Sequence, residues 1–174
     1  MALPTLLSAI LPGLMAGATP AGMPVGSEPD ALDSATARMV GGIIDYSRWP
    51  GEPEPLAICL VAAPRHVGGF GQIGSARDRD VRIRVVDSTS PTLSNGCQIL
   101  YIGPASLAET RRITATARGA AVLTIAEADP ACRSEAMFCL IPSRGSLSFR
   151  LNIDAVSRSQ VRVDPRVLRM AKGN

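Results

Sequence analysis

The stretch that decides the fold is Leu147-Ser-Phe-Arg-Leu-Asn-Ile-Asp-Ala-Val156, which is followed by Val161-Arg-Val-Asp-Pro-Arg-Val-Leu-Arg-Met170. The first segment begins with alternating apolar and polar residues, a pattern typical of a strand with one buried face. It then predicts a helical turn that Asp154 caps. The second segment predicts a short strand and a closing helix, in which Asp164 is the N-cap and Pro165 occupies the first turn. The chain therefore ends in a β-α-β-α succession.

The residues upstream alternate between apolar runs and helical patterns. Continuous apolar runs predict strands buried on both faces at residues 56–61, 98–102 and 120–125. Alternation predicts a half-buried strand with outward arginines at 81–86, and an antiparallel hairpin from 137–141 and 147–153. Helical spacing predicts helices at 32–49 and 104–118, the second ending at Gly119. We predict an α/β fold: a single-domain sandwich with a mixed, partly parallel sheet flanked by helices.

The composition argues against nucleic-acid binding. The 174 residues carry 18 Lys and Arg against 15 Asp and Glu, and aromatic residues make up only 3%. A nucleic-acid footprint needs a stronger one-sided basic excess, and single-strand binding also uses aromatic stacking platforms. We interpret the late basic residues as a solvated face, with an acidic protein partner left open: Arg144, Arg150, Arg158, Arg162, Arg166, Arg169 and Lys172.

The N-terminal residues resemble a secretory signal. Residues 2–15 carry no charged side chain, and with Pro4 and Pro12 they are too short and broken to span a bilayer. Ala16-Gly-Ala18 supplies the small-x-small pattern of a cleavage site, although no basic residue precedes the apolar run. We predict a cleaved signal peptide at 1–18, a disordered leader at 19–30, a domain at 31–174 and a periplasmic location.

Four cysteines, Cys59, Cys97, Cys132 and Cys139, form an even set. In an exported protein such a set favours two disulfides, whereas in the cytosol the thiols would stay free. Three pairings are open from the residues alone. The spacing is not that of a zinc site, and His66 is not placed to complete one. We predict no bound metal.

The segment Gly69-Phe-Gly-Gln-Ile-Gly74 has the literal form G-x-G-x-x-G, and Asp87 ends the following strand. A dinucleotide site requires the last glycine to lead into a packed helix whose N-terminus faces the pyrophosphate. Here Ser75–Asp80 follows, and it is too short and lacks an apolar stripe. We therefore interpret the motif as a surface loop and predict no cofactor.

No catalytic constellation is visible. His66 titrates near neutrality, but no nucleophile or orienting carboxylate can be assigned to it from sequence. The serines lack a G-x-S-x-G elbow, and the acidic residues form no paired motif. Trp49, before Pro50 at a predicted helix end, is interpreted as a core residue, with a partner contact as the alternative. We predict no catalytic residues and a protein that is not an enzyme.

The order and spacing of several short motifs resemble the YfiR-like family of small periplasmic proteins over about residues 35–171. Besides the two C-terminal segments quoted above, the motifs are Ser47-Arg-Trp-Pro50, Ala57-Ile-Cys-Leu60, Cys97-Gln-Ile-Leu-Tyr-Ile-Gly103 and Val122-Leu-Thr-Ile125. No single motif is specific. The resemblance implies that Cys59 pairs with Cys97 and Cys132 with Cys139, and that the bridges are linked to redox control.

The resemblance also implies a function. It indicates a non-catalytic regulator that binds the periplasmic sensor domain of an inner-membrane diguanylate cyclase and lowers cyclic-di-GMP synthesis. Release would follow reduction, or capture by an outer-membrane, peptidoglycan-linked protein; a homodimer remains open. The chain departs from the family at Arg133–Ala136 and Arg65–Asp80, so partner-contact residues are not carried over. The alternatives are a periplasmic small-molecule sensor that uses residues 68–74 and the carboxyl end of the sheet, and a cytosolic nucleotide-dependent enzyme.

Overall fold

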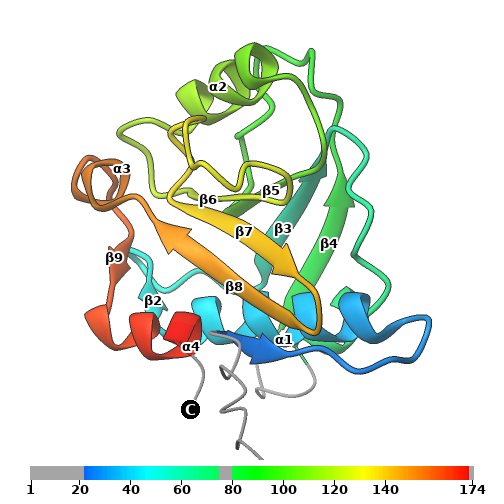
Figure 1. Ribbon diagram of the computed structural model, residues 1–174. Coiled ribbons are helices and arrows are strands. Elements are labelled where there is room, and N and C mark those ends of the chain that lie inside the picture. Colours follow the sequence, from blue (N-terminus) through cyan, green and yellow to red (C-terminus); the bar gives the residue numbers. More distant parts are fainter. Residues whose placement is uncertain (1–21, 75–79, 173–174) are drawn as a thin grey trace, which may run out of the picture.

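The computed structural model describes residues 22–74 and 80–172 (Figure 1). The predicted signal peptide, residues 1–18, lies outside the described residues. The strands are β1 (Met23–Pro24), β2 (Ser47–Arg48), β3 (Leu56–Val61), β4 (Val81–Val85), β5 (Ile99–Ile102), β6 (Leu123–Ala126), β7 (Phe138–Ser143), β8 (Ser146–Leu151) and β9 (Arg162–Val163). The helices are α1 (Ala31–Asp45), α2 (Leu107–Thr116), α3 (Ile153–Ser157) and α4 (Leu168–Lys172), with 3-10 turns η1 (Phe70–Gln72) and η3 (Pro165–Val167).

A seven-stranded sheet with the order β1-β8-β7-β6-β5-β3-β4 forms the centre. Strands β4, β3, β5, β6 and β7 run parallel, whereas β8 and β1 are antiparallel to their neighbours. Every residue of β3, β5 and β6 is buried, which explains their continuous apolar runs. The predicted α/β sandwich with a mixed, partly parallel sheet is confirmed.

Helices cover both faces of the sheet. Figure 1 shows α1 and α4 on one side of it and α2 on the other. On the α1 side, Met39 and Ile43 pack with Ile58 of β3. On the α2 side, Ile113 packs with Cys59, the next residue of β3. Because successive side chains of a strand point to opposite faces, Cys59 belongs to the layer beneath α2.

The first helix is shorter than the prediction of 32–49. It ends at Asp45, and Ser47 and Arg48 instead pair antiparallel with Val163 and Arg162. The Ser47 hydroxyl donates a hydrogen bond to the carbonyl of Ile43 at 2.7 Å. Pairing with a segment more than a hundred residues away in sequence overrides the helical periodicity.

The second helix begins at Leu107 and not at Pro104. Ser106 is the N-cap, and its hydroxyl accepts a hydrogen bond from the Glu109 backbone N–H at 3.1 Å. Ser106-Leu-Ala-Glu109 has the S-x-x-E form of a capping box, so the sequence carried the signal for the true start. The helix ends at Thr116, two residues earlier than predicted, and its C-cap is Ala117 and not Gly119. Gly119, with φ +73°, lies in the turn that follows.

The C-terminal prediction holds except for one cap. The hairpin of β7 and β8 is antiparallel as predicted, and the side chain of Asp164 accepts from the backbone N–H of Arg166 at the start of η3. Asn152, not Asp154, caps α3: its Oδ1 accepts from the Ala155 N–H at 3.0 Å. Asp154 lies in the first turn, where it pairs with Arg158.

Part of the segment predicted as a disordered leader belongs to the sheet. Met23 and Pro24 form β1 opposite Leu147 and Ser146 of β8. The N–H of the next residue, Val25, donates to the Gly145 carbonyl at 2.9 Å. The free edge of β8 accepts these residues, a contact that their Pro/Gly-rich composition did not reveal.

Candidate functional site

The cysteines form two disulfides, Cys59–Cys97 and Cys132–Cys139. The first links β3 to the residue that leads into β5, with a sequence separation of 38. Both of its residues are buried, with exposures of 0% and 3%, and they pack with Leu93 and Leu100 beneath α2. This bridge is part of the core, and a reductant reaches it only if α2 or the adjacent loop opens.

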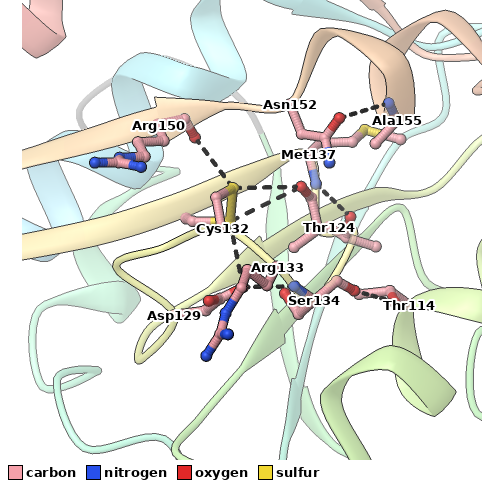
Figure 2. Close-up of a disulfide and its surroundings, with 12 residues drawn as sticks. Thr114, Thr124, Asp129, Cys132, Arg133, Ser134, Met137, Arg150, Asn152 and Ala155 are labelled. Atoms are coloured by element: carbon pink, nitrogen blue, oxygen red, sulfur yellow. Dashed lines mark hydrogen bonds between the residues drawn. A yellow bond between two sulfur atoms is a disulfide. The ribbon is translucent and has the colours of Figure 1, made fainter. Parts of the chain in front are cut away.

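The second disulfide lies nearer the surface. Cys139 is buried on β7, but Cys132 is partly exposed in the loop that precedes it, and their sequence separation is 7. Cys132 has a φ of +53°, a left-handed conformation that is uncommon outside glycine. Its sulfur lies 3.9 Å from the carbonyl oxygen of Ala136 and 4.0 Å from that of Arg150 (Figure 2). The bridge thus fastens an exposed loop to the beginning of β7.

Three side chains hold the loop around this bridge. Asp129 Oδ2 accepts a hydrogen bond from the Ser134 N–H at 2.7 Å, as Figure 2 shows. From α2, Thr114 Oγ1 donates to the Ser134 carbonyl at 2.7 Å, and Arg111 Nε donates to the Arg133 carbonyl at 2.9 Å. The loop is therefore tied to the same helix that covers the buried disulfide.

The environment of Asp129 favours its ionised form. Partial burial raises its pKa, but hydrogen bonds from Ser134 and the charge of Arg133 outweigh burial, and the pKa is lowered from its ordinary value. Asp129 is thus a carboxylate near neutral pH, and it accepts a charge-assisted hydrogen bond that helps to order the loop.

A second cluster lies at the carboxyl ends of the parallel strands. Glu127 follows β6 and is only 6% exposed. Its carboxylate accepts hydrogen bonds from the backbone N–H groups of Arg65 at 2.9 Å and His66 at 2.7 Å, in the loop after β3. The same loop crosses the end of β5 so closely that a Cβ on Gly103 would lie 2.4 Å from the Ala62 carbonyl oxygen. Glu127 therefore anchors the loop over the sheet edge.

The same loop is also tied to α1 by Asp33. His66 Nδ1 lies 3.0 Å from Asp33 Oδ1, and the Gly68 N–H donates to Asp33 Oδ2 at 3.2 Å. Beneath them, Tyr101 is fully buried, and its hydroxyl has no hydrogen-bond partner among the described residues. Burial, reinforced by the charges of Glu127 and Asp33, raises the pKa of Tyr101. Asp33 is thus the carboxylate beside His66 that could not be assigned from the sequence, and it positions the loop after β3.

Packing against α1 explains Gly68 and Gly69, but not Gly71 of the motif, where an added Cβ would meet nothing within 4 Å. A Cβ on Gly68 would lie 2.5 Å from Asp33 Oδ2, and one on Gly69 would lie 2.8 Å from the Ala37 Cβ. The motif continues into the short turn η1. Residues 75–79, which follow, lie outside the described part of the chain. A pocket of about 560 Å³ lies between this loop and α1, with Asp30, Arg38, Gly69 and Gln72 in its lining.

Trp49 is a core residue, as interpreted from sequence. It is 5% exposed, and its Nε1 donates to the Gln98 carbonyl at 3.0 Å. Arg48, just before Trp49, lies far in sequence from the late basic residues. In the structure Arg48 joins Arg162 and Arg166 around a hollow of about 380 Å³, which Asp45 and Asp164 also line. The β2–β9 pairing, invisible to local patterns, brings these arginines together.

Within residues 22–74 and 80–172, no three His, Cys, Asp or Glu side chains gather in a way that could hold a metal ion. In the same part of the chain, no helix is long and apolar enough to cross a membrane. The described features that stand out are thus the two disulfides and the loop anchored by Glu127 and Asp33.

A protein-family model matches most of the chain. The model of the YfiR/HmsC-like family matches residues 33–172, a span that begins in α1 and ends at the last residue of α4. It includes both disulfides, Glu127 and the loop after β3. The chain belongs to the YfiR/HmsC-like family.

Proposed function

We propose that the protein is a non-catalytic periplasmic regulator that binds the periplasmic sensor domain of an inner-membrane diguanylate cyclase and lowers cyclic-di-GMP synthesis. Membership of the YfiR/HmsC-like family carries this proposal. The four cysteines support the location, because all of them are placed to form disulfides, and disulfides persist in oxidising compartments. Export by cleavage after Ala18 belongs to the same proposal, and the mature domain would then include β1.

Redox control would act through the outer disulfide. Cys132 is accessible, whereas Cys59 and Cys97 are buried. Reduction of Cys132–Cys139 would leave the loop held by Asp129, by two side chains of α2 and by the Arg118–Glu135 ion pair. The loop surface would then change without loss of the core. Release of the cyclase could also follow capture by an outer-membrane, peptidoglycan-linked protein.

The test is a gene deletion in the native cell, with cyclic-di-GMP measured by mass spectrometry. The proposal expects the cyclic-di-GMP level to rise on deletion. The full chain should restore it, whereas a chain without residues 2–18 should not, because it is not exported. N-terminal sequencing of the complementing protein should begin at Thr19. An unchanged level in the deletion strain would refute the proposal.

A second candidate is a periplasmic small-molecule sensor, and the pocket of about 560 Å³ beside Gly69 favours it. Pockets for small ligands commonly have volumes of about 300–1,000 Å³. Native mass spectrometry of the protein isolated from the periplasm would detect a retained ligand as added mass. If only the mass of the polypeptide is found at every stage of purification, this candidate is rejected.

A further inference from the structure

Strand β4 is an edge of the sheet, with β3 on one side only. The Leu56 N–H donates to the Asp80 carbonyl, and the Val86 N–H donates to the Leu60 carbonyl. In a parallel ladder only alternate residues of a strand bond to the same neighbour. Given the register of β3 and β4, the backbone groups of Val81, Ile83 and Val85 therefore point away from β3. None of them bonds to another backbone group within the described residues.

The two edges of the sheet are protected differently. At the other edge, β1 has only two residues, and one of them is Pro24, which lacks an N–H. Short edge strands and proline are common devices against unwanted pairing. Strand β4 has five residues and no proline, and Val85 is 86% exposed. This edge is long enough to accept another strand.

The charges of β4 decide what kind of strand it accepts. Arg82 and Arg84 are exposed and share one face of the strand. If a second copy paired antiparallel with Ile83 opposite Ile83, Arg82 of each copy would face Arg84 of the other. A shift of the register by two residues would place Arg82 opposite Arg82 or Arg84 opposite Arg84. Those arginines would occupy the close, non-hydrogen-bonded positions, where opposed like charges are destabilising. An extended segment with acidic side chains two residues apart would place opposite charges there.

We propose that the outer edge of β4 binds an extended acidic segment of a partner protein as an added strand. Outward backbone groups of Val81, Ile83 and Val85 would supply the hydrogen bonds, and Arg82 and Arg84 would select acidic side chains. The inference goes beyond the proposed function, because it concerns the recognition mode and does not require the partner to be the cyclase.

The experiment uses the exported full chain in its native cell, with photo-reactive benzoylphenylalanine in place of Val85. Crosslinked peptides are then sequenced by mass spectrometry. The same group in place of Ile153, which is 71% exposed on α3, is the positional control. We expect position 85, and not 153, to crosslink to one segment that carries acidic residues two apart.

Variants at neighbouring positions separate charge from backbone pairing. Arg82→Glu should lower the crosslink yield at position 85 by about fivefold or more, whereas Arg82→Lys should leave most of it. Ile83→Pro removes one outward N–H and no bond to β3, so the yield should fall to background, while Ile83→Val should retain it. Circular dichroism of the purified variants checks that each one folds. If Ile83→Pro does not fold, the effect of Arg82→Glu on the crosslink yield alone tests the proposal.

Three outcomes would overturn the inference. The first is that position 85 crosslinks to no protein. The second is a crosslink to β4 of a second copy, and the third is a yield that Arg82→Glu does not change. Because the crosslinked peptide is sequenced, an acidic segment from a protein other than a cyclase would support this inference while contradicting the proposed function.

Discussion

The two disulfides share one face of the sheet but differ in burial and in the length of chain that they close. Cys59–Cys97 closes a long stretch of chain, and both of its residues are buried beneath α2. Cys132–Cys139 closes a short loop, and Cys132 reaches the surface. The first therefore stabilises the core, and the second controls the order of a surface loop. The predictions below test this division of roles.

Removal of the buried disulfide should have the largest effect. In the loop-entropy model a bridge of sequence separation 38 contributes at most about 4 kcal/mol. The double variant Cys59→Ala and Cys97→Ala should lose about this much free energy of unfolding, measured by urea denaturation. If this variant is more stable than the variant that lacks the outer bridge, the division of roles between the two disulfides is contradicted.

Removal of the outer disulfide should be milder. For a separation of 7 the same model gives at most about 2.5 kcal/mol. The variant Cys132→Ala and Cys139→Ala should therefore remain folded, with the near-ultraviolet circular dichroism of the core retained. In the native protein, mild reductant followed by alkylation and peptide mapping should label Cys132 and Cys139 before Cys59 and Cys97. Simultaneous labelling of all four would contradict the division.

Weakening the loop without touching sulfur should make the outer bridge easier to reduce. Asp129→Asn removes the charge from the carboxylate that accepts from Ser134, so stability should fall by about 1 kcal/mol and Cys132 should be labelled faster. The pKa of Asp129 is lowered in the folded state, so its contribution is fully present above its ordinary value of 3.8. The stability difference between wild type and Asp129→Asn should therefore shrink as the pH falls below that value. A difference that grows in acid would refute this role.

A change near the outer bridge that leaves the contacts of Asp129, Thr114 and Arg111 intact provides the control, because Asn152 lies beside the bridge but its side chain caps α3 (Figure 2). Asn152→Ala removes the N-cap of α3 and should cost about 1 kcal/mol of stability. The labelling order and rate of the four cysteines should stay as in the wild type in native conditions. If this substitution speeds labelling of Cys132 as much as Asp129→Asn does, then general loosening, not the loop contacts, sets its accessibility.

The sequence predicted those elements whose apolar runs and capping residues lie within the element itself. The apolar run at Leu56–Val61 identified β3, and Asp164 with Pro165 marked a true helix start. The S-x-x-E box at Ser106 marks the true start of α2, whereas the prediction placed that start at Pro104. The end of α1 was missed because β2 exists only through its pairing with β9.

The functional geometry depends on contacts that sequence spacing does not reveal. Glu127 binds backbone groups 61 and 62 residues away, and no nearby motif marks it. Asp33 lies opposite His66 because α1 packs against the loop after β3. Val85 is 86% exposed, although the alternating pattern of β4 places it on the same face as Val81 and Ile83, which are half-buried. The alternation of apolar and polar residues shows which side chains share a face of a strand, whereas the packing of other elements decides how deeply that face is buried.

The proposed function, with its redox control, requires the oxidised Cys132–Cys139 bridge to sustain binding to a membrane diguanylate cyclase. The most direct measurement is affinity capture of the tagged, exported protein from its native membranes, with and without mild reductant. Mass spectrometry would compare wild type with the variant Cys132→Ser and Cys139→Ser. We predict that a diguanylate cyclase is recovered with oxidised wild type, is released by reductant, and is weakly recovered with the variant in either condition. Recovery of no cyclase, or equal recovery in all conditions, would contradict the claim.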